Sequence, residues 1–416
     1  MSVRLTPARA PWLFEPGLQK LLAILSAGGE EARIAGGAVR DALLQRPVDD
    51  LDVATTTVPG ETVRRAEAAG FRTIPTGIDH GTVTVLVYGQ PVEVTTLRAD
   101  VDTDGRHATV AFGRDWTADA QRRDFTINGL YATAKGEVID LVGGLADIDK
   151  RILRFIGDPE KRIREDYLRI LRFFRFFAWY GAGRPDAEGL KACARLKDGL
   201  SRLSAERVWS ELRKLLSAPD PSRALLWMRQ ASVLTTILPE SEKWGIDAIH
   251  GLVAAEQARD WAPDPLLRLA AIVPRDPPRI RAMAERLRMS NAEAERLVAF
   301  AAAPDMSSKV RAATLPALLY RGDRQAIVDR LRLAVAGSPV ADEAALLAGL
   351  LELAQSWEKP VFPVRGDDLI GIGIEPGPAM GETLRRLEDA WVESGFALDR
   401  NELLSRAAGL TGQTYH

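Results

Sequence analysis

The sequence is poor in the residues that build disulfides, histidine-based metal sites and membrane spans. Its 416 residues include one cysteine, Cys193, so no disulfide can form within the chain and a reducing compartment is expected. The four histidines form no His-Asp cluster, so we expect no phosphohydrolase domain of the His-Asp type. The densest apolar run near the start, residues 21–25, is too short for a signal or membrane helix. These absences favour a cytoplasmic protein without a membrane partner.

The net charge is also small, because 55 basic residues nearly balance 57 acidic ones. A net charge of −2 gives no overall attraction to nucleic acid, so an RNA-binding surface would need local clustering of basic residues. Such a cluster lies between Lys150 and Arg175, where basic and aromatic residues are interleaved. A solvated helix face is the ordinary interpretation of a charge run. The aromatic residues favour a nucleic-acid surface instead.

The strongest chemical pattern lies in residues 33–55. This stretch predicts a strand, a turn at Gly36 and Gly37, a helix, and a second strand that carries Asp50 and Asp52. Because side chains alternate along a strand, both carboxylates lie on one face and repel each other unless a cation separates them. Mg²⁺ is the usual cation, and the glycine turn opens a helix N-terminus to an anion. Each feature alone is common, but together they indicate phosphoryl or nucleotidyl transfer.

The segments GGAVRD (36–41) and DLDVAT (50–55) resemble the first motif of a known superfamily, the nucleotidyltransferases that include DNA polymerase β. They are most similar to the class II tRNA nucleotidyltransferases (CCA-adding enzymes) and the bacterial poly(A) polymerases. The resemblance implies an α/β (α+β) polymerase-β-like nucleotidyltransferase head followed by an all-helical neck, body and tail. It also implies CTP and ATP as substrates, tRNA as partner, and two Mg²⁺ ions held by Asp50 and Asp52.

Two candidate features lie between this motif and the next one. Residues 82–97 predict a β-hairpin in which Glu93 points away from its apolar neighbours. Glu93 is either a third metal ligand or an exposed strand residue. Residues 98–121 predict a mobile loop or hairpin that includes Arg106 and His107. In the resembled family a loop at this place is linked to the switch from C to A addition.

The next motif, RRDFTIN (122–128), begins with two adjacent guanidiniums that suit a triphosphate, because each offers a bidentate donor fork. The structural alternative is a surface arginine pair, with the following aspartate capping a turn. In the resembled family this motif handles the triphosphate and the ribose. The predicted nucleotide-binding residues are Gly36, Gly37, Arg40, Arg122, Arg123, Asp124 and Asn128.

The basic cluster contains EDYLR (165–169), which is similar to the family's fourth motif. A helix over this segment would place Asp166 and Arg169 one turn apart, with their head groups pointing together. A carboxylate beside a guanidinium complements the pairing edges of cytosine and adenine and mismatches those of guanine and uracil. The resemblance gives these two residues a base-reading role. A salt bridge between Glu165 and Arg169 is the structural alternative.

Beyond the head, the sequence predicts helices broken by proline-rich turns. SAERVWSEL (204–212) matches a fifth motif, in which Glu206 and Arg207 would support the neck. Gly/Pro-rich elements near the end resemble a tail element of many CCA-adding enzymes, which favours tRNA contact there. The expected domains are a head over 1–149, a neck with base recognition over 150–216, a body over 217–335, and a tail over 336–416.

The sequence therefore predicts template-independent addition of CCA to the 3′ end of tRNA from CTP and ATP, with release of pyrophosphate. A poly(A) polymerase is the nearest alternative, because it shares the head motifs. Enzymes that add only CC, or only A, are further alternatives. A catalytically silent RNA-binding protein has no reason to keep clustered carboxylates, and a nucleotidyltransferase of antibiotics or proteins would not need the long helical tail. The oligomeric state is unknown.

Overall fold

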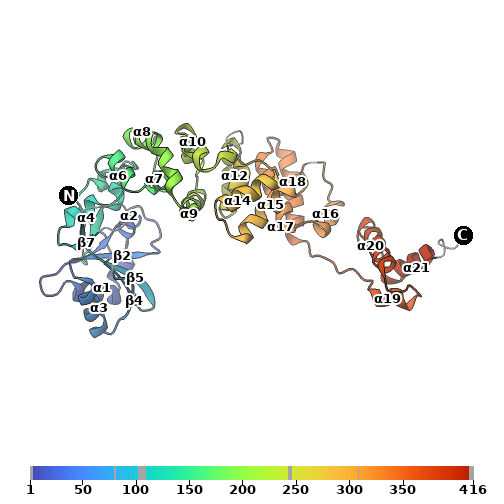
Figure 1. Cartoon of the computed structure of the whole chain (residues 1–416), viewed down its shortest axis with the longest axis horizontal. Coiled ribbons are helices and arrows are strands. Elements are labelled where there is room, and N and C mark those ends of the chain that lie inside the picture. Colours follow the sequence, from blue (N-terminus) through green and yellow to red (C-terminus); the bar gives the residue numbers. More distant parts are fainter. Residues whose placement is uncertain (1–2, 79–80, 102–108, 242–245, 308, 412–416) are drawn as a thin grey trace. The chain divides into compact units, whose positions relative to one another are not determined.

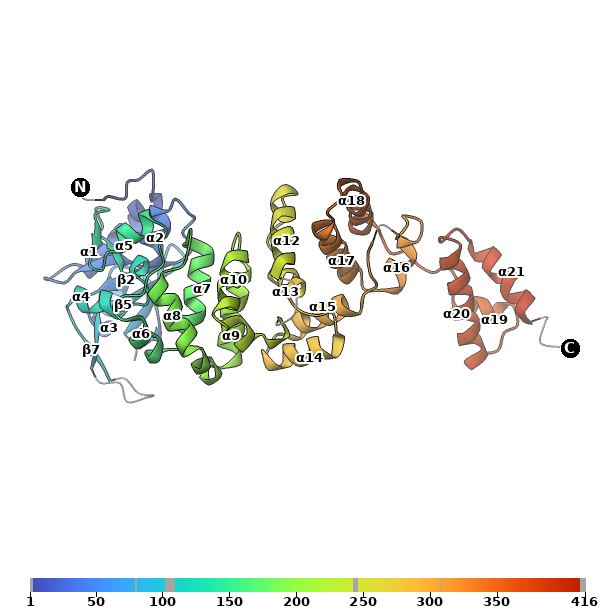
Figure 2. The ribbon, with the colours of Figure 1, turned by 90° about the horizontal axis from the view of Figure 1, so that it is seen from above.

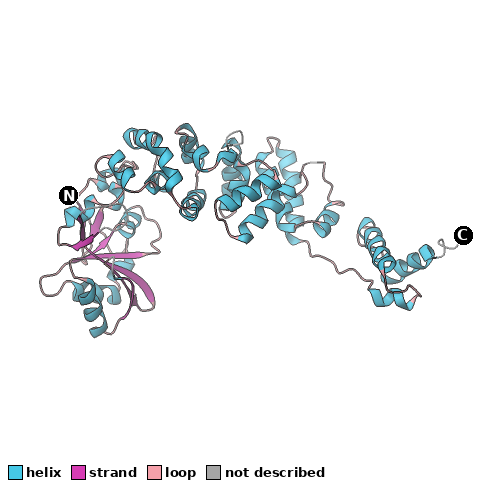
Figure 3. Ribbon diagram, viewed as in Figure 1, coloured by secondary structure: helices cyan, strands magenta, loops and turns pink. Residues whose placement is uncertain are grey.

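The chain forms two compact units, shown as a ribbon in Figure 1 and by secondary structure in Figure 3. The first contains Met1–Ser204 and Arg223–Ile237, and the second contains Ala205–Ser222 and Leu238–His416. Within the described residues every strand lies in the first unit, so the predicted fold class is confirmed. This computed structural model describes residues 3–78, 81–101, 109–241, 246–307 and 309–411.

A seven-stranded mixed sheet organises the first unit, in the order β3-β4-β5-β2-β1-β8-β9. Strand β2 pairs in parallel with β5, with Asp52 directly opposite Glu93, and the other neighbours are antiparallel. Alternation of buried residues along β4 and β5 confirms the hairpin predicted over 82–97. The strands are β1 (Ala32–Ala35), β2 (Leu51–Thr55), β3 (Arg72–Gly77), β4 (Thr82–Val87), β5 (Gln90–Thr96), β8 (Leu130–Ala132) and β9 (Val138–Asp140).

A separate two-stranded ribbon follows the sheet's central strands. It pairs β6 (Arg98–Val101) with β7 (Thr109–Phe112), so the hairpin predicted within 98–121 is present. Arg106 and His107 lie outside the described residues. The helices of this unit are α1 (Pro16–Leu25), α2 (Gly37–Leu43), α3 (Pro59–Ala68), α4 (Trp116–Gln121), α5 (Gly144–Asp149), α6 (Pro159–Glu165), α7 (Leu168–Tyr180), α8 (Ala187–Leu196), α10 (Ser222–Gln230) and α11 (Val233–Ile237).

The continuous helix predicted over 165–169 is wrong. Helix α6 ends at Glu165, Asp166 is extended (φ −154°, ψ 109°), and α7 begins at Leu168. The Asp166 carboxylate accepts a hydrogen bond from the Leu168 N–H at 3.1 Å. Aspartate competes with the helical backbone for such N–H groups, which is why it favours helix starts over helix interiors. Asp166 therefore lies in the break just before α7, and Arg169 lies in the first turn of α7.

The second unit is helical, and its hydrophobic residues form separate clusters. Helices α17 and α18 lie side by side in one cluster between Met306 and Ala354, and another cluster begins at Val364 (Figure 2). The four-part division stays a prediction. The helices are α9 (Ala205–Leu216), α12 (Ile246–Ala258), α13 (Pro265–Ile272), α14 (Pro277–Arg286), α15 (Asn291–Ala302), α16 (Leu315–Arg321), α17 (Arg324–Gly337), α18 (Ala341–Ser356), α19 (Gly366–Gly371), α20 (Pro378–Glu393) and α21 (Arg400–Thr411).

The length and polarity of the helices show whether any of them could span a membrane. In the part of the chain that the structure describes, none of the helices is both long enough and apolar enough to cross a bilayer.

Candidate active site

A tight turn at Gly36 joins β1 to α2. Gly36 has φ +64°, and its N–H donates to the carbonyl of Leu130 in β8 at 2.9 Å. A Cβ at this position would come within 2.9 Å of the Arg123 Nη1 atom. The turn therefore needs glycine both for its left-handed backbone and for the approach of this guanidinium. The structure thus brings the glycine turn and the second motif together.

Gly36→Ala is expected to lower stability by about 1–3 kcal/mol, from backbone strain and the displaced guanidinium. It should also raise the KM for nucleoside triphosphates. Gly37→Ala is the matched control, because a Cβ there would stand 3.6 Å from Arg40, an ordinary contact, and the residue is helical. Thermal unfolding and nucleotide titration of both variants measure the effect. Equal stability of the two variants would contradict the need for glycine at position 36.

Three carboxylates belong to β2, to the residue just before it, and to the paired strand β5. Asp50 precedes β2, Asp52 is its second residue, and Glu93 is its cross-strand neighbour on β5. Displacement of water by surrounding protein raises the pKa of Asp52, and the carboxylates of Glu93 and Asp50 raise it further. The Arg123 guanidinium acts in the opposite direction. The strands therefore gather negative charge that a cation would stabilise.

This donor set fits Mg²⁺ in chemistry, because hard divalent cations prefer carboxylate oxygens and complete their shell with water and phosphate. Within the described residues, no group of three or more His, Cys, Asp or Glu side chains already converges as a metal cage. Asp50 and Asp52 would supply the protein ligands. The place of Glu93 as a third ligand stays a prediction.

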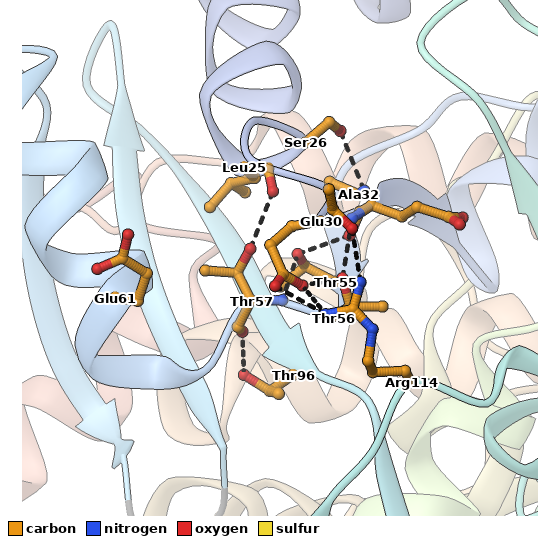
Figure 4. Close-up of polar contacts among 12 residues, drawn as sticks. Leu25, Ser26, Glu30, Ala32, Thr55, Thr56, Thr57, Glu61, Thr96 and Arg114 are labelled. Carbon is orange, nitrogen blue, oxygen red and sulfur yellow. Dashed lines mark hydrogen bonds and ion pairs between the residues drawn. The ribbon is translucent and has the colours of Figure 1, made fainter.

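The strand that carries Asp52 is anchored at its other end by threonines (Figure 4). The hydroxyl of Thr57 donates to the Leu25 carbonyl at 2.9 Å, and that of Thr96 donates to the Thr57 carbonyl at 2.7 Å. The Thr56 hydroxyl donates to Glu30, whose carboxylate also accepts from Arg114 at 2.7 Å. These bonds tie β2 to α1 and to the segment that follows β7.

Both arginines of the second motif are held by Asp119, a residue that the sequence analysis did not single out. Its buried carboxylate pairs with Arg122 at 2.5 Å and with Arg123 at 3.2 Å, and accepts from the Tyr131 hydroxyl at 2.7 Å. Burial alone would raise the pKa of Asp119, but Arg123, Arg122 and Tyr131 lower it overall. The sequence spacing could have predicted these ion pairs, because Asp119 precedes the two arginines by three and four residues, which places them on one face of a helix.

Arg40, Asp124 and Asn128 form a buried network rather than an open triphosphate surface. The Arg40 Nη1 atom donates to the Asn128 amide oxygen at 2.5 Å, and the Asn128 amide nitrogen donates to Asp124 at 2.9 Å. Asp124 also pairs with Arg172 of α7 at 2.5 Å. Burial would raise the pKa of Asp124, but Arg172 and the hydrogen bonds lower it. These residues brace the glycine turn from inside, and their contact with nucleotide stays a prediction.

Arg162 of α6 links the second motif to the predicted base-reading segment. It is 8% exposed and donates to the carbonyls of Arg122 and Arg123. Its Nη1 atom also donates to Glu165 at 2.5 Å, and Glu165 pairs with Arg169 at 2.6 Å, so the predicted salt bridge between the last two is present. The sequence analysis did not predict this role of Arg162, because the spacing of side chains gives no indication of a contact with the backbone carbonyls of Arg122 and Arg123.

The predicted neck residues lie on α9, in the second unit. Glu206 and Arg207 are both exposed in its first turn. Further along this helix, Trp209 and Arg213 bond to the Glu293 carboxylate at 3.3 Å each. Support by Glu206 and Arg207 stays a prediction.

Comparison with known proteins agrees with this geometry. Residues 32–154 match the family model "Poly A polymerase head domain", and residues 184–244 match "Probable RNA and SrmB- binding site of polymerase A". The chain is 31% identical over 415 residues to the CCA-adding enzyme of Limosilactobacillus fermentum, with 99% of each chain covered. The chain belongs to the CCA tRNA nucleotidyltransferase family.

Other members of this family give the same result. The mitochondrial CCA tRNA nucleotidyltransferase 1 of Mus musculus is 34% identical over 399 residues, which cover 94% of this chain and 90% of the relative. The crystal structure of the Bacillus stearothermophilus CCA-adding enzyme in complex with CTP matches with a TM-score of 0.72 at 26% identity, and covers 96% of this chain and 100% of that one. The resemblance found in the sequence is therefore confirmed, and with it the nucleotidyltransferase class.

Proposed function

We propose that this chain adds C and A nucleotides to the 3′ end of tRNA from CTP and ATP, without a nucleic-acid template, and releases pyrophosphate. The observation that carries the proposal is the carboxylate pair of Asp50 and Asp52 beside the Gly36 turn and the Arg123 guanidinium. Full-length likeness to CCA-adding enzymes supports the substrates, and one such relative is known in complex with CTP.

In the proposed reaction, the 3′-hydroxyl of the RNA attacks the α-phosphate of the nucleotide and pyrophosphate leaves. Arg122 and Arg123, held by Asp119, would orient the triphosphate, and the backbone at Gly36 would approach it closely. Asp50 and Asp52 would hold two Mg²⁺ ions. When bound, Mg²⁺ activates the attacking hydroxyl and neutralises charge on the leaving phosphate.

Base selection is proposed for Asp166 and Arg169 at the start of α7. Arg169 is oriented by Glu165 and by the carbonyl of Arg162, to which it donates at 2.7 Å. Because Arg162 also donates to the carbonyls of Arg122 and Arg123, the base-reading and triphosphate-binding segments share one support. A correctly paired base would then be coupled to a correctly placed triphosphate.

The test uses tRNA transcripts that end before CCA, after C and after CC, with Mg²⁺ and single or paired nucleotides. Growth by CCA followed by a stop is expected. Arrest at CC, or extension only from CC, would make the chain one half of a split pathway. Long A tails would identify a poly(A) polymerase, the second candidate, which the head-domain match favours. No extension would contradict both.

We also propose a cytoplasmic location. The only cysteine, Cys193, is a buried free thiol, as suits a reducing compartment. Relatives include bacterial and mitochondrial enzymes, so fractionation of source cells is the direct test.

A further inference from the structure

A cavity of about 550 Å³ lies within the second unit, far along the sequence from the catalytic motifs. Its lining comes from helices α12, α13, α14, α15 and α17, which Figure 2 labels, and from the loop between α13 and α14. Ala270, Phe300 and Leu333 contribute an apolar floor. Arg275, Arg279 and Arg330 contribute guanidiniums. Cavities of this size typically accept small organic groups.

The guanidiniums have few counter-charges. Arg275 and Arg330 share one oxygen of Asp305, whose side chain is 80% exposed. The carboxylate that lines the cavity, Asp276, caps α14 and accepts from the Arg279 N–H at 3.1 Å. Within the described residues, no hydrogen bond or ion pair engages the guanidinium of Arg279, which is exposed. Cations therefore outnumber carboxylates at the cavity.

Repulsion between the guanidiniums of Arg275 and Arg330 contributes to the lowered pKa of Arg330. Burial and the neighbouring Arg275 guanidinium together lower the pKa of Arg330 to about 10, while Asp305 acts in the opposite direction. An anion bound beside Arg275 and Arg330 would remove this repulsion.

We propose that this cavity binds one nucleotide of the RNA substrate, with its phosphate on Arg275, Arg279 and Arg330 and its base on the apolar floor. The inference rests on the proposed function and adds an RNA subsite to it. Arginine forks match phosphate geometry, which explains the guanidiniums. A bare anion would make no favourable contact with the apolar floor, whereas a nucleobase has a flat, largely apolar face that can pack on it. An acidic peptide would satisfy the arginines and leave that floor empty.

The first test is the affinity of the full chain for tRNA, measured at several salt concentrations. Arg279→Glu is expected to weaken binding about tenfold and to reduce the salt dependence by close to one phosphate contact. Arg281→Glu is the matched control, because Arg281 is exposed on the same helix and does not line the cavity. It should change affinity less than about twofold. The kcat at saturating tRNA should be unchanged in Arg281→Glu.

The second test locates the RNA directly. Arg279→Cys places a thiol at the cavity, and the native Cys193 is buried, so maleimide labelling reports on position 279. Added tRNA should slow labelling at least fivefold, while CTP alone should not. Equal protection by CTP would indicate a free-nucleotide site, and protection by polyglutamate an acidic-peptide site. Either result overturns the RNA assignment.

Failure of this inference can be told apart from failure of the proposed function. If Arg279→Glu binds tRNA as well as the original chain and position 279 is not protected, the subsite is wrong, while CCA addition by the same variant leaves the function standing. If the original chain neither binds nor extends tRNA, both are wrong.

Discussion

Replacement of Asp52 by alanine is expected to reduce nucleotide transfer by about 1,000-fold or more, which corresponds to about 4 kcal/mol of lost transition-state stabilisation. Asp52 lies between Asp50 and Glu93 with its pKa raised by desolvation and by both neighbours, so it is the centre of the negative charge that a cation would neutralise. Removal of a carboxylate from this group should relieve repulsion, so folding stability should be kept. Single-turnover incorporation of CTP into tRNA measures the loss.

The matched control is Asp49→Ala, because Asp49 is an exposed neighbour that precedes the strand. Its activity should lie within about twofold of the original chain. Residual activity of Asp52→Ala above about 10%, a loss of less than roughly 1.4 kcal/mol, would overturn the metal assignment. Circular dichroism and thermal unfolding of both variants separate lost chemistry from lost structure.

Asp119→Asn is expected to lower kcat/KM for CTP and ATP alike by about 100-fold, or about 2.7 kcal/mol. The change keeps the size of the side chain but removes the charge that pairs with Arg122 and Arg123. Asp119 is a positioning residue, so the loss should appear in KM for the triphosphate more than in kcat. A loss confined to kcat, or one that differs between CTP and ATP, would contradict this role.

The control for this variant is Asp115→Asn, on the same helix. Asp115 caps α4 through the N–H groups of Thr117 and Ala118, and asparagine caps a helix equally well. The loss of kcat/KM caused by Asp119→Asn should also be independent of pH near neutrality. Because the pKa of Asp119 is lowered in the folded chain, its charge contributes fully above the unfolded pKa of about 3.9 and is lost only as pH falls through the lowered folded value.

Local patterns in the sequence predicted the head well. The pattern of residues 82–97 predicted a β-hairpin, and the pattern of residues 33–55 predicted a strand that carries Asp52, although the strand begins at Leu51 and Asp50 lies just before it. Both depend on residues a few positions apart, where strand geometry alone decides the outcome. The family followed from the same short segments.

The sequence could not predict contacts made across long separations. Arg40 reads as a helix residue beside a glycine turn, and only the fold places it on Asn128, 88 positions away. Arg162 likewise meets Arg122 and Arg123 through their carbonyls, which no side-chain pattern encodes. The break at Asp166 was missed for a different reason. Helical periodicity on both sides concealed a residue whose own side chain favours a helix start.

The buried network of Arg40, Asn128, Asp124 and Arg172 has a consequence for how this sequence can diverge. Each member satisfies polar groups of the next, so loss of any one removes a hydrogen-bond or ion-pair partner from a neighbour in the network. Substitutions here should be strongly epistatic, so that a change at one position is tolerated only after a compensating change at another. Natural drift should therefore alter these four residues as a set or leave them untouched.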